Sequence, residues 1–146
     1  SMPSVSKIPI HFFSELPSFQ LKDRIKLRAW LTHVAVNQHY TFVNLNYVFC
    51  SDDYLLEINQ HYLNHDTLTD IITFDYCIGK TINGEIYISV ERVKENAKER
   101  SVSFKDELHR VMVHGILHLT GFKDKTKEQQ TNMRAQEDLC LNLRSF

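Results

Sequence analysis

The sequence predicts an α+β sandwich formed by one domain, residues 1–146, with a small mixed sheet of about four strands and about five helices. Three observations lead to this prediction. Segments with the two-residue period of strands interleave along the chain with segments of helical period. The 146 residues are 42% hydrophobic and 24% charged, which suffices for one buried core. All three prolines lie within the first 17 residues, so the remainder can be rich in regular elements.

The first half of the chain contains two predicted strands and two predicted helices. Residues 5–13 are expected to form an edge strand, and alternating apolar residues over 42–49 predict a second strand. Ser51 and the two aspartates that follow it offer an N-cap for a short helix through about Asn59. Residues 19–37 are expected to form a helix with a broad apolar face. That face consists of Leu21, Ile25, Leu27, Trp30, Leu31 and Val34.

The next segment is expected to contain a buried strand, a turn, another strand and a helix. Residues 71–74 form a short apolar run typical of a buried strand. The dipeptide Asn83-Gly84 is a turn signal, and residues 85–90 alternate again. Residues 91–100 are highly charged and predict a helix with a solvated face.

Capping residues define the two predicted helices at the C-terminal end. Ser103 can cap a helix that runs to about Thr120. Thr126 and Gln129 have the spacing of a capping box, which predicts a last helix ending at about Arg144.

Composition points to a cytoplasmic protein. The three cysteines, Cys50, Cys77 and Cys140, are odd in number and form no C-x-x-C pair, which favours a reducing compartment. We see no apolar run of membrane-spanning length and no signal peptide, so no membrane partner is expected. Ser1 before Met2 is interpreted as a cloning remnant. The net charge of −1 excludes a polycation, although a local basic patch could still bind nucleic acid.

The strongest chemical signal is a predicted metal site. His114 and His118 are four residues apart in the predicted helix, so both imidazoles lie on one face. Gly121 can end this helix, and Asp124 can then supply a third ligand as the chain turns back. Two imidazoles and a carboxylate leave one coordination position open, as in catalytic zinc sites. The sequence therefore predicts one Zn²⁺ per chain and a metal-dependent hydrolase.

Gly115 argues against a peptidase. The spacing of the three ligands matches the metzincin pattern H-E-x-x-H-x-x-G-x-x-H, except that Asp124 replaces the third histidine and Gly115 replaces the glutamate that acts as general base. Glycine inside a helix costs roughly 1 kcal/mol relative to alanine. Two interpretations remain open, namely close approach of the backbone to substrate or metal, or close packing against another element.

Arg110 is a further candidate catalytic residue, together with His114 and His118. The three form a narrow polar stripe on an otherwise apolar helix, which suggests the floor of a cleft. Arg110 could bind a phosphate or orient the site. The alternative is an ion pair with Glu107 or another acid. His109 lies off this stripe and is interpreted as structural.

Residues 114–122 read His-Gly-Ile-Leu-His-Leu-Thr-Gly-Phe. This run resembles the signature of the YbeY family of endoribonucleases. The resemblance covers most of residues 40–145. Upstream segments match in order and spacing, namely residues 59–62, Asp66, residues 69–74 and residues 83–89.

The resemblance implies a zinc-dependent endoribonuclease that cleaves single-stranded RNA. Members act in maturation of small-subunit (16S) ribosomal RNA and in ribosome quality control, so the implied partners are ribosomal RNA and the small subunit. The implied fold is an α+β sandwich with the metal helix beneath a cleft. The sequence departs from the family at Asp124, where many members carry histidine, and at Leu63, where many carry arginine. Arg110 or Lys123 could replace that missing cation.

Other residues could contact RNA. Thr69 and Asp70 precede a buried strand and either line the cleft or cap a turn. Lys123, Lys125 and Lys127 flank the metal loop and either contact phosphates or form a solvated loop.

Two alternative functions remain at this point. One is another metal-dependent hydrolase such as a peptidase. The other is a non-catalytic ribosome-assembly factor that keeps the metal for structure.

Overall fold

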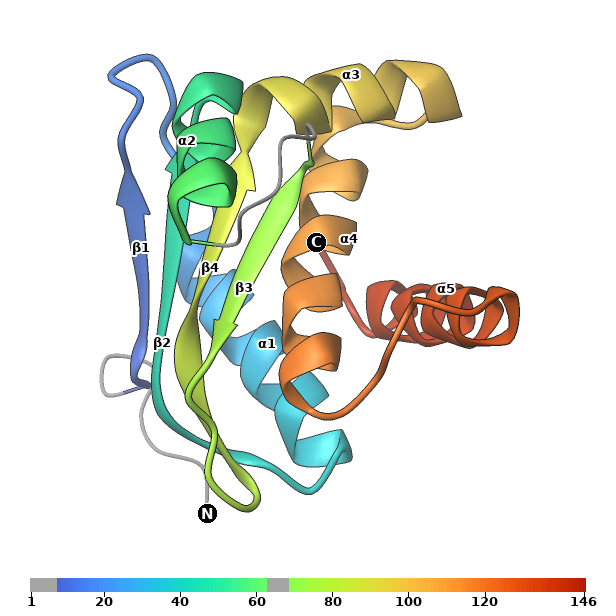
Figure 1. The fold of residues 1–146 in the computed structure, drawn as a ribbon. Coiled ribbons are helices and arrows are strands. Elements are labelled where there is room, and N and C mark those ends of the chain that lie inside the picture. The colour runs from blue at the N-terminus through green and yellow to red at the C-terminus, as the bar shows by residue number, and fades with distance from the viewer. Residues whose placement is uncertain (1–7, 63–68) are drawn as a thin grey trace.

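Strands and helices interleave along the chain in the computed structural model, which describes residues 8–62 and 69–146 (Figure 1). Within these ranges there are four strands and five helices, as the sequence predicted. The strands are β1 (Ile10–Ser14), β2 (Thr41–Cys50), β3 (Ile71–Asp75) and β4 (Thr81–Ser89). The helices are α1 (Arg24–Asn37), α2 (Asp52–Tyr62), α3 (Val90–Arg100), α4 (Phe104–Leu119) and α5 (Lys127–Asn142).

The four strands form one mixed sheet in the order β1-β2-β4-β3. β1, β2 and β4 run parallel, and β3 pairs antiparallel with β4. β1 and β3 are therefore the two edges of the sheet, which confirms the expected edge position of the first strand. Both β3 and its neighbour β4 lie against α4.

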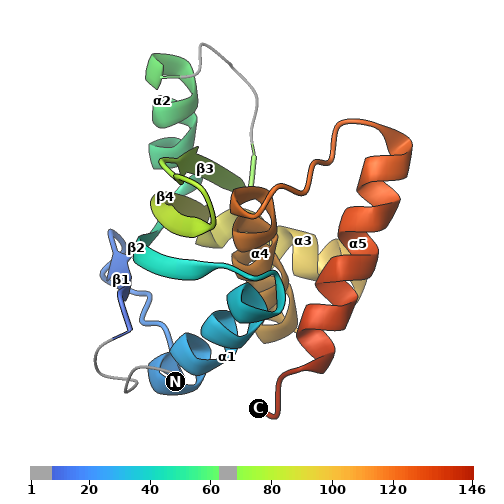
Figure 2. The same ribbon diagram turned by 90° about the horizontal axis from the view of Figure 1, so that it is seen from below.

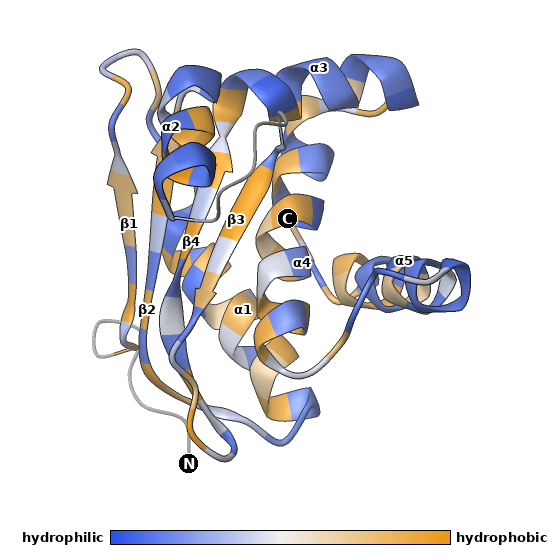
Figure 3. Cartoon of the chain, viewed as in Figure 1, coloured by the Kyte–Doolittle hydropathy of each residue, from blue (hydrophilic) through white to orange (hydrophobic). Residues whose placement is uncertain are grey.

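Helices cover both faces of the sheet. Figure 2 shows α1 and α4 on one face and α2 on the other, with α5 packed on the far side of α4. The core between the sheet and α4 is fully buried, and the hydroxyl of Tyr47 on β2 donates a hydrogen bond to the carbonyl of Met112 on α4 at 2.8 Å. Hydrophilic residues predominate on α3 and α5, which form the outer layer (Figure 3). Within the described residues, no helix combines the length and apolarity needed to cross a membrane.

The predicted turn at Asn83-Gly84 is wrong, because both residues lie inside β4. Glycine is required there by a neighbouring strand. A Cβ atom on Gly84 would lie 2.5 Å from the carbonyl oxygen of Phe74 on β3. The actual turn between β3 and β4 contains Gly79, whose φ of +60° is in the left-handed region that glycine adopts readily.

The first helix is shorter than predicted. α1 begins at Arg24 rather than at residue 19, after Asp23 in a left-handed conformation with φ 60°. Leu21 is buried but precedes the helix, and Ile25, which we placed on the apolar face, is 67% exposed. Within α1, only the later part of the predicted apolar face, from Leu27 onward, is therefore buried in the core.

Local capping predicted the starts of α2, α4 and α5 correctly. The Ser51 hydroxyl accepts a hydrogen bond from the backbone N–H of Tyr54, and the Ser103 hydroxyl accepts one from that of Asp106. Thr126 and Gln129 form the reciprocal pair of bonds of a capping box at the start of α5. The capping box thus fixes the end of the loop that joins α4 to α5.

Candidate metal centre

α4 and the turn after it bring together the three predicted ligands. His114 and His118 lie on the face of α4 that is only partly buried. The helix ends at Leu119, and Gly121 takes a positive φ of 104° so that the N–H of Phe122 can bond back to the carbonyl of Leu117 at 2.9 Å. This turn reverses the chain and carries Asp124 over the two imidazoles.

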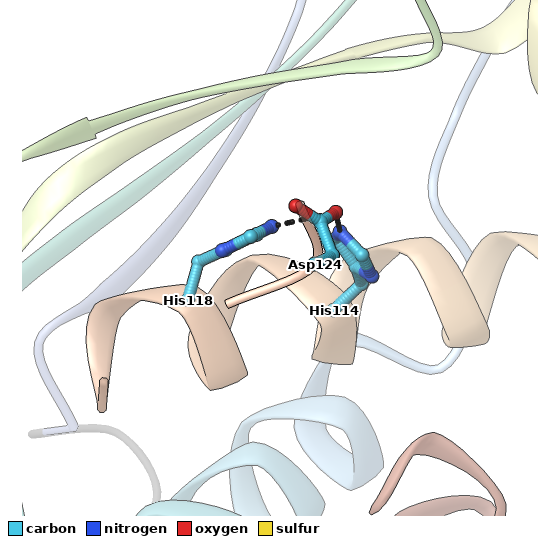
Figure 4. A group of neighbouring side chains, drawn as sticks. All are labelled: His114, His118 and Asp124. Atoms are coloured by element: carbon cyan, nitrogen blue, oxygen red, sulfur yellow. Dashed lines mark hydrogen bonds and ion pairs between the residues drawn. The ribbon is translucent and has the colours of Figure 1, made fainter. Parts of the chain in front are cut away.

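The side chains of His114, His118 and Asp124 point toward one another (Figure 4). Nε2 of His114 lies 3.3 Å from Oδ2 of Asp124, and Nε2 of His118 lies 3.2 Å from the same oxygen. The candidate ligand atoms of the three residues lie within 4.8 Å of one another. Two nitrogen atoms and one carboxylate oxygen thus surround one point, as the predicted zinc ligands should.

The other nitrogen of each imidazole has its own acceptor. Nδ1 of His114 lies 2.6 Å from Oε2 of Glu137, and Nδ1 of His118 lies 3.0 Å from the carbonyl oxygen of Phe122. These contacts favour the tautomer in which Nδ1 carries the proton and donates it. Both Nε2 lone pairs then face the carboxylate of Asp124, and a cation among them satisfies all three groups. Metal-binding histidines in proteins are oriented in the same way.

The charges around His114 favour a cation. Burial alone would lower the pKa of His114, but the hydrogen bond to Glu137 and the charges of Glu137, Asp124 and Asp70 raise it above its ordinary value. Burial alone would raise the pKa of Glu137, but hydrogen bonds from His114 and Arg110 lower it. The carboxylate of Glu137 therefore stays ionised and contributes a negative potential to the site.

The candidate ligands lie on the floor of a cleft of about 1100 Å³. The floor is α4, which confirms that the polar stripe of Arg110, His114 and His118 lines a cleft. β3 and the residues before it form one wall, and α5 forms the other. The polar residues of these walls are Thr69, Asp70, Thr73 and Asp75 on the β3 side and Lys127, Gln130, Thr131, Arg134 and Glu137 on α5.

Comparison with known proteins identifies the family. A sequence model described as Endoribonuclease YbeY matches residues 15–144. The chain belongs to the YbeY endoribonuclease family. Two relatives named Endoribonuclease YbeY are those of Cytophaga hutchinsonii, 51% identical over 94% of this chain and 96% of the relative, and Flavobacterium psychrophilum, 50% identical over 86% and 89%. A solution structure of a Thermotoga maritima protein matches with a TM-score of 0.64 and 30% identity, covering 91% of this chain and 89% of that one.

Arg110, the further residue proposed for catalysis, forms ion pairs inside the protein. Its Nη1 lies 3.0 Å from Glu137 and its Nη2 lies 2.8 Å from Asp138. The alternative of an ion pair with an acid is therefore confirmed, although the partner is not Glu107. The carboxylate of Glu107 pairs instead with Arg100 at 2.7 Å. The guanidinium of Arg110 is thus engaged by two carboxylates at the floor of the YbeY cleft.

The remaining predicted residues divide between packing and the cleft. Gly115 faces Ile86 of the sheet, which supports the packing interpretation. Both interpretations of Thr69 hold, because it lines the cleft while its hydroxyl donates to the carbonyl of Ile71 at 3.2 Å. Of the three lysines near the metal loop, only Lys127 is among the described residues that line the cleft. Leu63 and Asp66 lie outside the described residues.

Sequence analysis missed Glu137, which contacts His114 directly. A signal was present in the last helix, where Met133, Glu137 and Cys140 follow helical spacing and are all buried in the structure. An acidic residue on a buried stripe needs a partner that compensates its charge. Such a glutamate could therefore have been paired with the histidines of the neighbouring helix.

Proposed function

We propose that this chain is a zinc-dependent endoribonuclease that cleaves single-stranded RNA and acts in maturation of 16S ribosomal RNA and in ribosome quality control. The family supports the reaction, and residues 1–146 would form one hydrolase domain working with the small ribosomal subunit in the bacterial cytoplasm. The observation that carries the proposal is the convergence of His114, His118 and Asp124 on one point at the floor of a large cleft.

His114, His118 and Asp124 would hold the zinc ion. Two imidazoles and one carboxylate form a common donor set of catalytic zinc sites. When bound, zinc lowers the pKa of a coordinated water toward neutrality and polarises a phosphoryl oxygen. The carboxylate of Asp124 also makes the site one charge more negative than a third histidine would, which strengthens its attraction for a divalent cation.

The wall formed by α5 would bind the phosphates of the RNA. Arg100 and Arg110 are paired with Glu107 and Glu137, so these cations are largely neutralised within the protein. Lys127 and Arg134 are the other cations that α5 presents to the cleft, whereas the opposite wall carries the carboxylates of Asp70 and Asp75. Arg134 lies 3.7 Å from Glu137, but this contact is longer than that of Arg110 and the Arg134 side chain is 47% exposed. Lys127 and Arg134 are seven residues apart, and their separation of about 10 Å along the helix axis would span two or three nucleotides.

Opposite charges on the two walls would orient the strand. The phosphates would run along α5, and the sugar hydroxyls and bases would face Thr69 and Asp70. Hydroxyl and carboxylate oxygens on that wall can accept hydrogen bonds from the 2′-OH, which distinguishes RNA from DNA. The substrate class therefore fits the polar groups that line both walls of the cleft.

Cleavage assays with the zinc-loaded protein test this proposal. Wild-type protein should cleave a labelled single-stranded RNA, and a chelator should abolish cleavage until zinc is restored. His114→Ala should lose cleavage while its fold and RNA binding persist. Unchanged cleavage by His114→Ala would overturn the proposal, and RNA binding without cleavage by the wild type would favour the assembly-factor alternative. Cleavage of a peptide panel would instead favour the peptidase, which the absence of a carboxylate at Gly115 argues against.

A further inference from the structure

A chain of charged groups links the metal centre to the outer helix. Asp138 contacts Nη2 of Arg110 at 2.8 Å, and Nη1 of Arg110 contacts Oε1 of Glu137 at 3.0 Å. The second oxygen of the same carboxylate, Oε2, lies 2.6 Å from Nδ1 of His114. Both oxygens of Glu137 are thus engaged: Oε1 by the guanidinium of Arg110 and, at 3.7 Å, by that of Arg134, and Oε2 by the imidazole.

Burial makes this arrangement rigid. The side chain of Glu137 is 7% exposed and that of Arg110 is 19% exposed. An ionised carboxylate removed from water is costly unless its oxygens are hydrogen-bonded and its charge is compensated. Any rotation of Glu137 would weaken its contact with Arg110 or with His114. The carboxylate therefore has one favourable orientation, and that orientation presents Oε2 to His114.

The two imidazoles are held by different kinds of group. Nδ1 of His118 contacts the backbone carbonyl of Phe122 at 3.0 Å, within the turn that ends α4. His118 is therefore oriented by the local fold of its own segment. His114 depends on a side chain 23 residues away on another helix. A substitution of Glu137 can therefore remove the hydrogen bond that orients His114 without altering the one that orients His118.

We propose that Glu137 is a positioning residue for the metal centre, which holds the Nδ1 proton of His114 so that Nε2 is left free to bind the cation. This inference rests on the proposed metal site and adds a residue to it. Arg110 acts one step further away, by fixing the carboxylate of Glu137. Arg110 thereby contributes to the reaction through Glu137 and His114 rather than by touching the RNA. A role limited to joining α4 to α5 is the structural alternative.

Zinc affinity is the measurement that separates these roles. We would measure the zinc dissociation constant by competition with a chromophoric chelator for the wild type, Glu137→Gln and Glu137→Ala. Loss of such an outer partner typically weakens metal binding by about 10- to 100-fold. Glu137→Gln keeps the shape and one acceptor oxygen, so the expected loss is about 10-fold, with a loss nearer 100-fold for Glu137→Ala. Glu128→Gln is the matched control, because it removes one negative charge from an exposed position of α5 outside this chain of contacts, and its affinity should stay within about threefold of the wild type.

A spectroscopic readout tests the orientation itself. In ¹⁵N spectra of the zinc-loaded wild type, the His114 ring should carry its proton on Nδ1, and that proton should exchange slowly with water. In Glu137→Ala the exchange should be faster, whereas the His118 ring should be unchanged. A purely structural role for Glu137 would alter thermal stability and leave both zinc affinity and the His114 signal as they are.

The outcomes are distinguishable from failure of the proposed function. Folded Glu137→Gln and Glu137→Ala proteins that bind zinc as tightly as the wild type would overturn the positioning role while leaving the metal site intact. If Glu137→Ala does not fold, the isosteric Glu137→Gln decides the question. A wild type that binds no zinc would overturn the proposed function itself.

Discussion

Gly115 of α4 lies so close to Ile86 of β4 that a Cβ atom at this position would be 2.6 Å from Cδ1 of the isoleucine. The same Cβ would be 3.1 Å and 3.2 Å from two further carbons of Ile86, a residue with no exposed surface. The missing side chain lets the metal helix sit directly on the sheet. The depth of the helix below the cleft therefore depends on this glycine.

Gly115→Ala should destabilise the protein although alanine favours helices. The helix gains up to about 1 kcal/mol from the substitution, whereas overpacking a buried contact costs about 1–3 kcal/mol. We expect a net loss of about 1 kcal/mol in the free energy of unfolding, measured by urea denaturation. Ile86→Val removes Cδ1, so the double variant should be less destabilised than the sum of the single variants by at least about 0.5 kcal/mol. Strict additivity would show that the two side chains do not compete for this space.

Lys127 and Arg134 should set the salt dependence of RNA binding. For single strands, each phosphate contact adds about 0.7 to the slope of log affinity against log salt. The Lys127→Gln/Arg134→Gln double variant should therefore bind single-stranded RNA more weakly, with a slope smaller by about 1.4. Lys26→Gln/Lys98→Gln is the matched control, because it makes the same change in net charge at exposed residues that are not among the described lining of the cleft. Equal slopes for the two double variants would contradict the proposal that Lys127 and Arg134 bind the phosphates of the RNA.

His109 should make the protein less stable as the pH falls. Burial, followed by the charges of Arg144 and Lys105, lowers the pKa of His109 from 6.5 to about 4, and Nδ1 accepts a hydrogen bond from Arg144 at 2.7 Å. This confirms the structural role expected for His109. Because the unfolded chain takes up the proton first, stability is full above pH 6.5 and falls progressively toward pH 4. The shift corresponds to roughly 3 kcal/mol over this window.

His109→Gln provides the comparison, since its amide oxygen can still accept the bond from Arg144 but cannot titrate. The free energy of unfolding of the metal-free variant should decline less between pH 7 and pH 4.5 than that of the wild type. The same decline in both proteins would show that other groups govern the pH dependence.

Signals that act within one segment predicted the fold well and identified candidate ligands that the structure brings together. Ser103 and the pair Thr126 and Gln129 fixed helix starts because a cap depends only on residues a turn apart. The four-residue spacing of His114 and His118 placed both imidazoles on one face for the same reason. Family resemblance then added the fold and the reaction, which spacing alone does not determine.

For features that depend on contacts between distant segments, the sequence prediction was wrong or missing. Asn83-Gly84 has the local chemistry of a turn, yet the carbonyl of Phe74 on another strand explains the glycine. The start of α1 was misplaced because packing, rather than the apolar pattern, decides where the helix begins. Glu137 was missed because its role appears only when α5 is placed against α4.

Metal content tests the central claim most directly. We would purify the wild type, Asp124→Ala and Asp124→His without a histidine tag, titrate each with zinc, remove free metal and determine bound metal by elemental analysis. Because Asp124 faces both Nε2 atoms, the account predicts about one zinc per chain in the wild type, little or none in Asp124→Ala, and restored binding in Asp124→His, which supplies another accepted zinc ligand. A wild type without zinc after titration, or an Asp124→Ala variant that binds as well as the wild type, would contradict the assignment of the metal centre.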